Sequence, residues 1–186
     1  QNSTCIEVAD DDYGVEATPL GEIASLYYLC HSTIATFNAE IYELGPSDLP
    51  TLLRVLCDAS EFDELPVRHN EEHVNLQMSR ELPWKMDERS MDSPHTKANL
   101  LLQAHFSRAT LPMSDYITDT KSVLDQTARV LQAMVDIAAD GGWLFTALGA
   151  MYLAQMVTQG RFLDDPHPLS DLPHMSDEAE AALARR

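Results

Sequence analysis

Positively charged residues are scarce in this chain. Its 186 residues include 12 Lys and Arg against 30 Asp and Glu, a formal net charge of −18. Residues 1–53 contain nine acidic residues and no Lys or Arg. Binding to duplex DNA or to an anionic membrane by overall charge requires a cationic protein, so the composition excludes that class of binder. Any contact with nucleic acid must therefore be local.

Cysteines are also few. Cys5, Cys30 and Cys57 form no CxxC motif, and an odd number of thiols in mixed or apolar surroundings favours a reducing compartment, the nucleus or the cytosol. We expect Cys30 and Cys57 to face the core. The first residues lack an initiator Met, a basic segment and an apolar segment. This excludes a signal peptide and indicates an excised piece of a longer chain.

Motifs for nucleotide binding and nucleophilic catalysis are missing. The sequence has no P-loop, no GxGxxG and no GxSxG, which excludes an autonomous ATPase, and we expect no catalytic residue and no cofactor in this chain. One zinc-like pattern, HxxEH, runs from His69 to His73. Pro66 and a helix cap at Asn70 place His69 before the helix, with solvated carboxylates following. The two imidazoles would not share a face, so we expect no metal site.

The twenty residues from Gly141 to Gly160 carry no charge, a length that could span a bilayer. Threonines, glutamines and four glycines dilute the hydrophobicity of this stretch. Asp140 and Arg161 provide no basic flank beside it. We therefore expect no membrane contact, and instead a helix from Trp143 to Gln159 that is the most buried helix of a bundle.

The remaining pattern predicts an all-α helical bundle with one small β-element. Alternating runs at 5–8 and 13–16, separated by Asp10 to Asp12, predict an N-terminal β-hairpin with an acidic turn. The longest helix is expected from a cap at Ser114 to about Ala139, before two glycines. Its inward apolar stripe is expected to comprise Val123, Thr127, Val130, Met134 and Ile137. The other helices are expected within the ranges 20–44, 48–59, 70–82, 93–111 and 176–186, the first range as two helices or one bent helix.

One window is less acidic than the rest. Residues 93–132 contain three aspartates and four cations, namely Lys97, Arg108, Lys121 and Arg129. On the long helix, one polar stripe separate from the apolar one comprises Ser122, Gln126, Arg129 and Ala133. Such a stripe can admit a nucleic-acid strand. Alternatively it is a solvated face on which Arg129 pairs with Asp125 or Asp136, and the residues alone favour this second interpretation.

Several separated runs occur in a characteristic order. They are PLGEIASLYY at 19–28, EFDELPVRHNE at 61–71 and KANLLLQAHFSR at 97–108. These runs resemble the Sec sixty-three homology region of large Ski-two-like helicases. Two further runs, DTKSVLDQTARV at 119–130 and QMVTQGRF at 155–162, are more similar to the cointegrator branch of these helicases than to the spliceosomal branch. The resemblance covers residues 14–174.

The resemblance implies a division of the chain. Residues 1–18 would be the tail of a winged-helix domain, 19–163 a helical bundle, and 164–186 a linker with the start of a helix-loop-helix. The long helix would be a ratchet that contacts the single strand leaving the motor. The family's contacts on that helix correspond to Arg129 and Gln126, beside Ser122 of the same stripe.

The first functional expectation is a non-catalytic module of an ATP-dependent helicase that braces the motor domains and guides the strand at its exit. ATP and magnesium would belong to the parent protein. The expected partners are the protein's own motor domains, single-stranded nucleic acid bound weakly in isolation, and other subunits of a cointegrator-type complex. The alternative is an acidic scaffold that docks partner proteins. A translocon subunit, which shares this homology region, is the third possibility.

Overall fold

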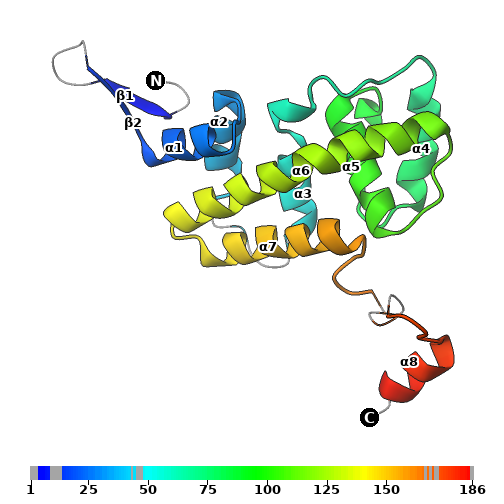
Figure 1. Cartoon of the computed structure of the whole chain (residues 1–186). Coiled ribbons are helices and arrows are strands. Elements are labelled where there is room, and N and C mark those ends of the chain that lie inside the picture. The colour runs from blue at the N-terminus through cyan, green and yellow to red at the C-terminus, as the bar shows by residue number, and fades with distance from the viewer. Residues whose placement is uncertain are drawn as a thin grey trace.

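The computed structural model describes residues 4–8, 14–42, 44, 48–165, 167, 169 and 172–184. Within these ranges the chain forms eight α-helices, two short strands and two 3-10 turns. The predicted all-α bundle with an N-terminal hairpin is confirmed (Figure 1). None of the described helices has the length and apolar character needed to cross a membrane.

The longest helix, α6 (Ser114–Asp140), packs along α7 (Leu144–Gln159) (Figure 1). The predicted inward stripe of α6 is buried at all five positions. The turn between the two helices contains Gly142 with φ +74°, a left-handed conformation that glycine adopts without strain. The start of α6 differs from the prediction. Met113 holds the cap position in an extended conformation, so Ser114 is already the first helical residue.

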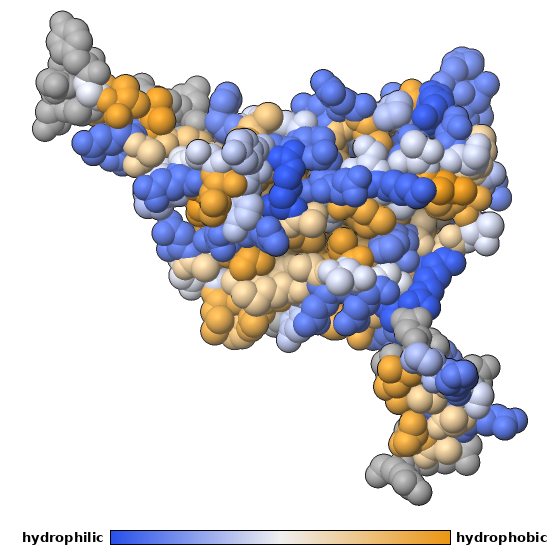
Figure 2. Space-filling view, viewed as in Figure 1, coloured by the Kyte–Doolittle hydropathy of each residue, from blue (hydrophilic) through white to orange (hydrophobic). Residues whose placement is uncertain are grey.

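The most buried helix is α5 (Pro94–Phe106) and not α7, so that prediction was wrong. α5 packs against α3 (Leu49–Cys57), α4 (Glu71–Glu81), α6 and α7, and nine of its 13 residues are buried. α7 packs through one face only. Its other face leaves Leu144 65%, Phe145 58% and Met151 46% exposed, and Figure 2 shows hydrophobic surface over this helix. An uncharged sequence does not reveal how many faces of its helix are covered.

The predicted hairpin is attached to the first helix. β1 (Ile6–Val8) pairs antiparallel with β2 (Val15–Ala17), and Glu7 lies opposite Glu16. The expected acidic turn, 10–12, lies outside the described residues. The backbone N–H of Thr18 donates to the carbonyl of Cys5 at 3.2 Å, and the Thr18 hydroxyl accepts from the Gly21 N–H at 3.1 Å. This cap sets the start of α1 (Pro19–Leu26).

A sharp turn separates α1 from α2 (His31–Glu40), which confirms two consecutive helices. Tyr28 in this turn has φ +52°. Cys30 holds the cap position of α2 and is exposed, whereas Cys57 at the end of α3 is buried. The expectation that Cys30 faces the core was therefore wrong, because Cys30 lies at the surface turn before α2, where its backbone N–H donates to the carboxylate of Glu61.

The C-terminal helix α8 (Asp177–Ala184) stands apart from the other helices in Figure 1. Its Glu180 is buried and accepts a hydrogen bond from the N–H of Leu169 at 2.9 Å. This bond fastens the helix to the linker that precedes it.

Candidate nucleic-acid interface on the long helix

One face of α6 is open to solvent. With 27 residues the helix is roughly 40 Å long. Its exposed residues in the central part recur every three or four positions and share one face, namely Thr118, Lys121, Ser122, Asp125, Ala128 and Gln132. This open face carries one cation and one anion. The remaining side chains on it are small or uncharged, so it is electrically neutral in a chain of −18.

Arg129 lies at the edge of the open face and is bound within the chain. Its Nη1 donates to the carbonyls of Tyr27 at 3.0 Å and Tyr28 at 2.6 Å. Its Nε donates to Oε1 of Gln126 at 3.0 Å. The last carbonyls of a helix have no partner inside it, so the guanidinium satisfies the end of α1.

The solvated ion pair favoured by the residues alone is absent. Among the described residues no ion pair joins Arg129 to Asp125 or Asp136. Asp136 instead accepts a hydrogen bond from the Tyr27 hydroxyl at 2.7 Å, and this bond raises the pKa of Tyr27. Tyr27 and Tyr28, which bind Arg129 and Asp136, lie about a hundred positions earlier in the chain. No local sequence pattern predicts these contacts.

The other members of the predicted stripe differ in exposure. Ser122 is exposed and Gln126 is half-buried. Both line a shallow cavity of about 210 Å³ beside the segment from Glu61 to Pro66. Ala133 is fully buried, because α1 packs on α6 near this end of the helix. The stripe that reaches solvent is thus shorter than the helical spacing predicted.

Two of the charged residues in the less acidic window, 93–132, do not reach the surface. Lys97 is fully buried and pairs with Asp119, so neither contributes to the surface. Arg108 donates from Nε to the carbonyl of Gly160 at 3.2 Å but remains an exposed residue. Because one cation and one acid are removed together, the net charge of the exposed part of the window is unchanged.

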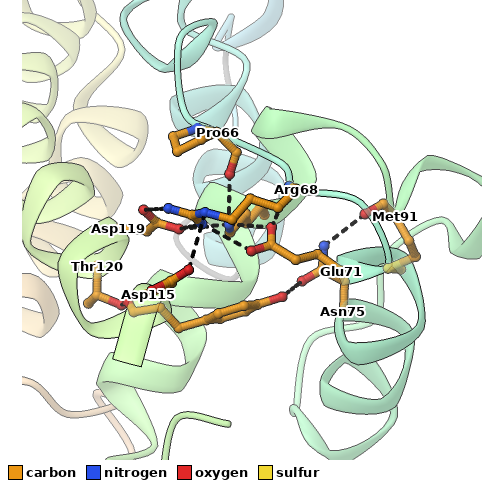
Figure 3. A network of polar contacts seen from close by, with 10 residues as sticks. Pro66, Arg68, Glu71, Asn75, Met91, Asp115, Asp119 and Thr120 are labelled. Carbon is orange, nitrogen blue, oxygen red and sulfur yellow. Dashed lines mark hydrogen bonds and ion pairs between the residues drawn. The ribbon is translucent and has the colours of Figure 1, made fainter. Parts of the chain in front are cut away.

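Lys97 belongs to a buried network between α4, α5 and α6 (Figure 3). Its ammonium lies 2.6 Å from Glu71 Oε2 and 2.7 Å from Asp119 Oδ2, and it donates to the carbonyl of Pro66 at 2.7 Å. Arg68 bonds both carboxylates from the rim of the network, at 3.0 Å and 2.7 Å. Glu71 was expected to be solvated. That expectation was wrong, since the two cations hold it inside.

The network continues through Tyr116. The Lys97 ammonium lies 4.7 Å above the centre of the Tyr116 ring, and the Tyr116 hydroxyl donates to Asn75 Oδ1 at 2.7 Å. Asn75 in turn donates to the carbonyl of Met91 at 2.8 Å. Every polar group named here has a partner within the chain. The network therefore holds α4, α5 and α6 together and supports the back of the open face.

The histidines do not form a cluster. His69 precedes α4, as predicted, and Asn70 has φ +72° at the cap position. No group of three or more His, Cys, Asp or Glu in the described part of the chain has the arrangement of a metal site. His95 and His105 bond the carbonyls of Cys57 and Val157, at 2.8 Å and 2.9 Å.

Comparison with known proteins gives several matches. The family described as the Sec63 Brl domain matches residues 17–186. The DExH-box ATP-dependent RNA helicase DExH14 of Arabidopsis thaliana is 49% identical over 187 residues, which covers 100% of this chain. Human activating signal cointegrator 1 complex subunit 3 is 50% identical over 175 residues and 94% of the chain. The human U5 small nuclear ribonucleoprotein 200 kDa helicase is 36% identical over 178 residues and 96% of the chain.

The chain spans 8% of the length of each of these three relatives. The identity to the cointegrator subunit is higher than the identity to the U5 helicase, which agrees with the order of similarity in the sequence runs. With the family matched over nearly the whole chain, the resemblance is confirmed, and the chain belongs to the Sec63 Brl domain family.

Proposed function

We propose that this chain is a non-catalytic module of an ATP-dependent nucleic-acid helicase, which braces the motor domains and guides the single strand where it leaves them. Two of the relatives above are named as helicases, and all three are much longer than this chain. The observation that carries the proposal is the neutral open face of α6 in an otherwise acidic chain. A polyanionic strand is repelled least along such a face.

In this proposal the strand runs beside Ser122, Gln126 and Arg129. Residues 1–18 are the end of a winged-helix domain, 19–163 are the bundle, and 164–186 begin a helix-loop-helix. ATP and magnesium act in the motor domains of the longer protein. Its partners are those motor domains, the single strand, and other subunits of a cointegrator-type complex.

The test uses the full-length helicase that contains this chain. Arg129→Glu breaks the bonds to Tyr27 and Tyr28 and places a negative charge beside the strand. Strand unwinding should fall much more than ATP binding, because the nucleotide pocket lies elsewhere. Arg80→Glu on α4 is the matched control, because it makes the same charge change at a side chain that is 67% exposed. Wild-type unwinding by folded Arg129→Glu would reject the strand-guiding role.

A second function, an acidic scaffold for partner proteins, has its own support. Residues 1–53 contain nine acidic residues and no Lys or Arg, and the outer face of α7 exposes large apolar side chains. If this is the function, Phe145→Asp should weaken assembly with other subunits and leave unwinding by the isolated helicase intact. If the chain is instead the proposed helicase module, Arg129→Glu should lower strand unwinding more than it lowers assembly with other subunits.

A further inference from the structure

The turn between α1 and α2 presents an aromatic ring to solvent. Tyr28 is 88% exposed, the highest exposure of any large hydrophobic side chain among the described residues. It also has φ +52°, in the left-handed region that bulky residues rarely occupy. A left-handed residue commonly follows the last turn of a helix, but glycine usually holds that position. For a tyrosine the conformation persists only where the surrounding structure enforces it.

Several bonds hold the backbone of this turn. The N–H of Tyr28 donates to the carbonyl of Ser25 at 3.3 Å, and the N–H of Leu29 donates to the carbonyl of Ala24 at 2.9 Å. Arg129 clamps the carbonyl of Tyr28 from the other side at 2.6 Å. Next to it, the Tyr27 hydroxyl is bound to Asp136. The backbone is thus fixed from two sides, while the Tyr28 ring has no hydrogen bond or ring contact within the described part of the chain.

Packing does not explain this arrangement, since a ring that is 88% exposed contributes little to the core. An aromatic ring on a rigid backbone is instead suited to binding, because little conformational freedom is lost when a partner stacks on it. The direct contact with Arg129 places Tyr28 beside the open face of α6.

The negative charge of the chain limits the ways in which it can contact a single strand. Single strands are bound by cations on phosphates and by aromatic rings that stack on bases. Cations are scarce here, and the guanidinium of Arg129 is already bound to two carbonyls and an amide oxygen. Stacking needs no cation and tolerates any base, because every base has an aromatic face.

We infer that Tyr28 is a stacking platform for a base of the single strand and that Arg129 is the positioning residue that holds it. The inference deepens the proposed function and rests on it. The Tyr28 ring takes one base of a strand that runs along the open face of α6, and Arg129 acts on the strand through the backbone of the turn.

The experiment measures the affinity of the full-length helicase for single strands that carry one 5-iodouracil, made both as RNA and as DNA. Tyr28→Asn removes the ring with a residue that tolerates the left-handed conformation. It should weaken binding about 5- to 150-fold, the range expected for one stacked base. Tyr28→Phe and Tyr28→Trp should bind as the wild type does. Phe145→Ala, which removes an exposed ring from α7, should also leave binding unchanged.

Ultraviolet irradiation gives a direct readout. The iodinated base should cross-link to the peptide that contains Tyr28. In Arg129→Gln, affinity and cross-link yield should fall together, while the dependence of affinity on salt keeps its slope, because no phosphate contact is lost. A slope lower by about 0.7 would show that Arg129 contacts a phosphate directly, and would overturn its positioning role.

Failure of the inference can be told apart from failure of the proposed function. If Tyr28→Asn binds the strand as the wild type does while Arg129→Glu still loses unwinding, the stacking role is rejected and the strand-guiding module stands. If both variants unwind normally, the proposed function fails as well. If Tyr28→Asn loses only a protein subunit, the ring is a protein contact and the inference is overturned.

Discussion

The ammonium of Lys97 lies 2.6 Å from the carboxylate of Glu71, and both side chains are almost completely buried, at 0% and 3% exposure. Asp119 shares the same ammonium, and Arg68 supplies the second cation. The buried carboxylates of Glu71 and Asp119 are thus balanced by two cations, and Arg68 also pairs with the exposed Asp115 at 3.3 Å. Removing one member leaves a buried charge without its partner, which costs far more than losing a surface ion pair.

Replacing Lys97 by Met should destabilise the fold by about 3 to 5 kcal/mol, because Glu71 and Asp119 would remain buried with only Arg68 beside them. Urea denaturation followed by circular dichroism measures the change. Lys121→Met, at an exposed position on α6, is the control and should change the free energy of unfolding by less than about 0.5 kcal/mol. Equal midpoints for the two variants would contradict the role of the network.

The same network predicts a loss of stability in acid. Burial by itself raises the pKa of Glu71, but hydrogen bonds from Lys97 and Arg68 outweigh it and hold the pKa below its ordinary value. Asp119 behaves in the same way. A carboxyl group with a lowered pKa stabilises the fold above its unfolded-state pKa, and that contribution is lost as the pH falls through the folded-state pKa.

The free energy of unfolding should therefore decrease below about pH 4. Urea midpoints between pH 7 and pH 3 test this. Lys97→Met lacks the main cation and should show a smaller decrease over the same range. A variant curve parallel to that of the wild type would mean that other carboxylates cause the acid sensitivity.

Gly21→Ala should detach the N-terminal hairpin from α1. A Cβ at this position would lie 2.0 Å from the carbonyl oxygen of Cys5, a backbone atom that cannot move without moving the strand. Hydrogen exchange should show faster exchange of the Thr18 N–H, which donates to that carbonyl, while α5 and α6 stay protected. Ser25→Ala, an exposed change on α1, should leave the exchange of Thr18 as it is. Unchanged protection in Gly21→Ala would refute the close contact.

Of the three thiols, Cys30 should react first with an alkylating reagent in the native protein. It is exposed, whereas Cys57 and Cys5 are buried. Partial desolvation and the nearby Glu61 carboxylate raise the pKa of Cys30, so labelling should be slow at neutral pH and faster in alkali. Mass spectrometry of the labelled peptides identifies the site. Labelling of Cys57 at a similar rate would show that α3 opens readily.

A chelator should leave the thermal midpoint unchanged, because His69 lies before α4 and Glu71 is engaged by two cations. The measurement is a thermal melt with and without chelator, accompanied by elemental analysis. His73→Ala should melt as the wild type does in both conditions. Stoichiometric zinc, or a fall of several degrees with chelator, would restore HxxEH as a metal motif.

Much of the fold could be predicted because its signals are local. Gly142 ends α6 and Pro94 begins α5 where glycine and proline are favoured, and the inward stripe of α6 follows the helical period. The burial of α7 could not be predicted in this way. Leu144 and Phe145 have the same hydrophobicity at an open face as they would in a core, and only the arrangement of neighbouring helices decides their exposure.

The candidate site was predictable only in part, since its partners are distant in sequence. Helical spacing placed Ser122 and Gln126 together near solvent. The bond between Arg129 and Tyr28 joins residues 101 positions apart, and the pair of Lys97 and Glu71 spans 26 positions. Neither contact follows a periodic pattern in the sequence. Charge and spacing therefore counted Lys97 among the surface cations, whereas tertiary packing buries it.

The bonds from Arg129 to the end of α1 have a consequence for biosynthesis. α1 has eight residues, too few to be stable alone in water, and its anchor Arg129 lies 102 positions after Tyr27. At ribosomal speeds of about 5–20 residues per second, the anchor emerges roughly 5 to 20 s after α1. Throughout that interval the apolar side chains of Leu20 and Ile23, which pack on the core in the finished fold, remain open to water and to chaperones. α1 is therefore translated before α6 and docks on it only after α6 has formed.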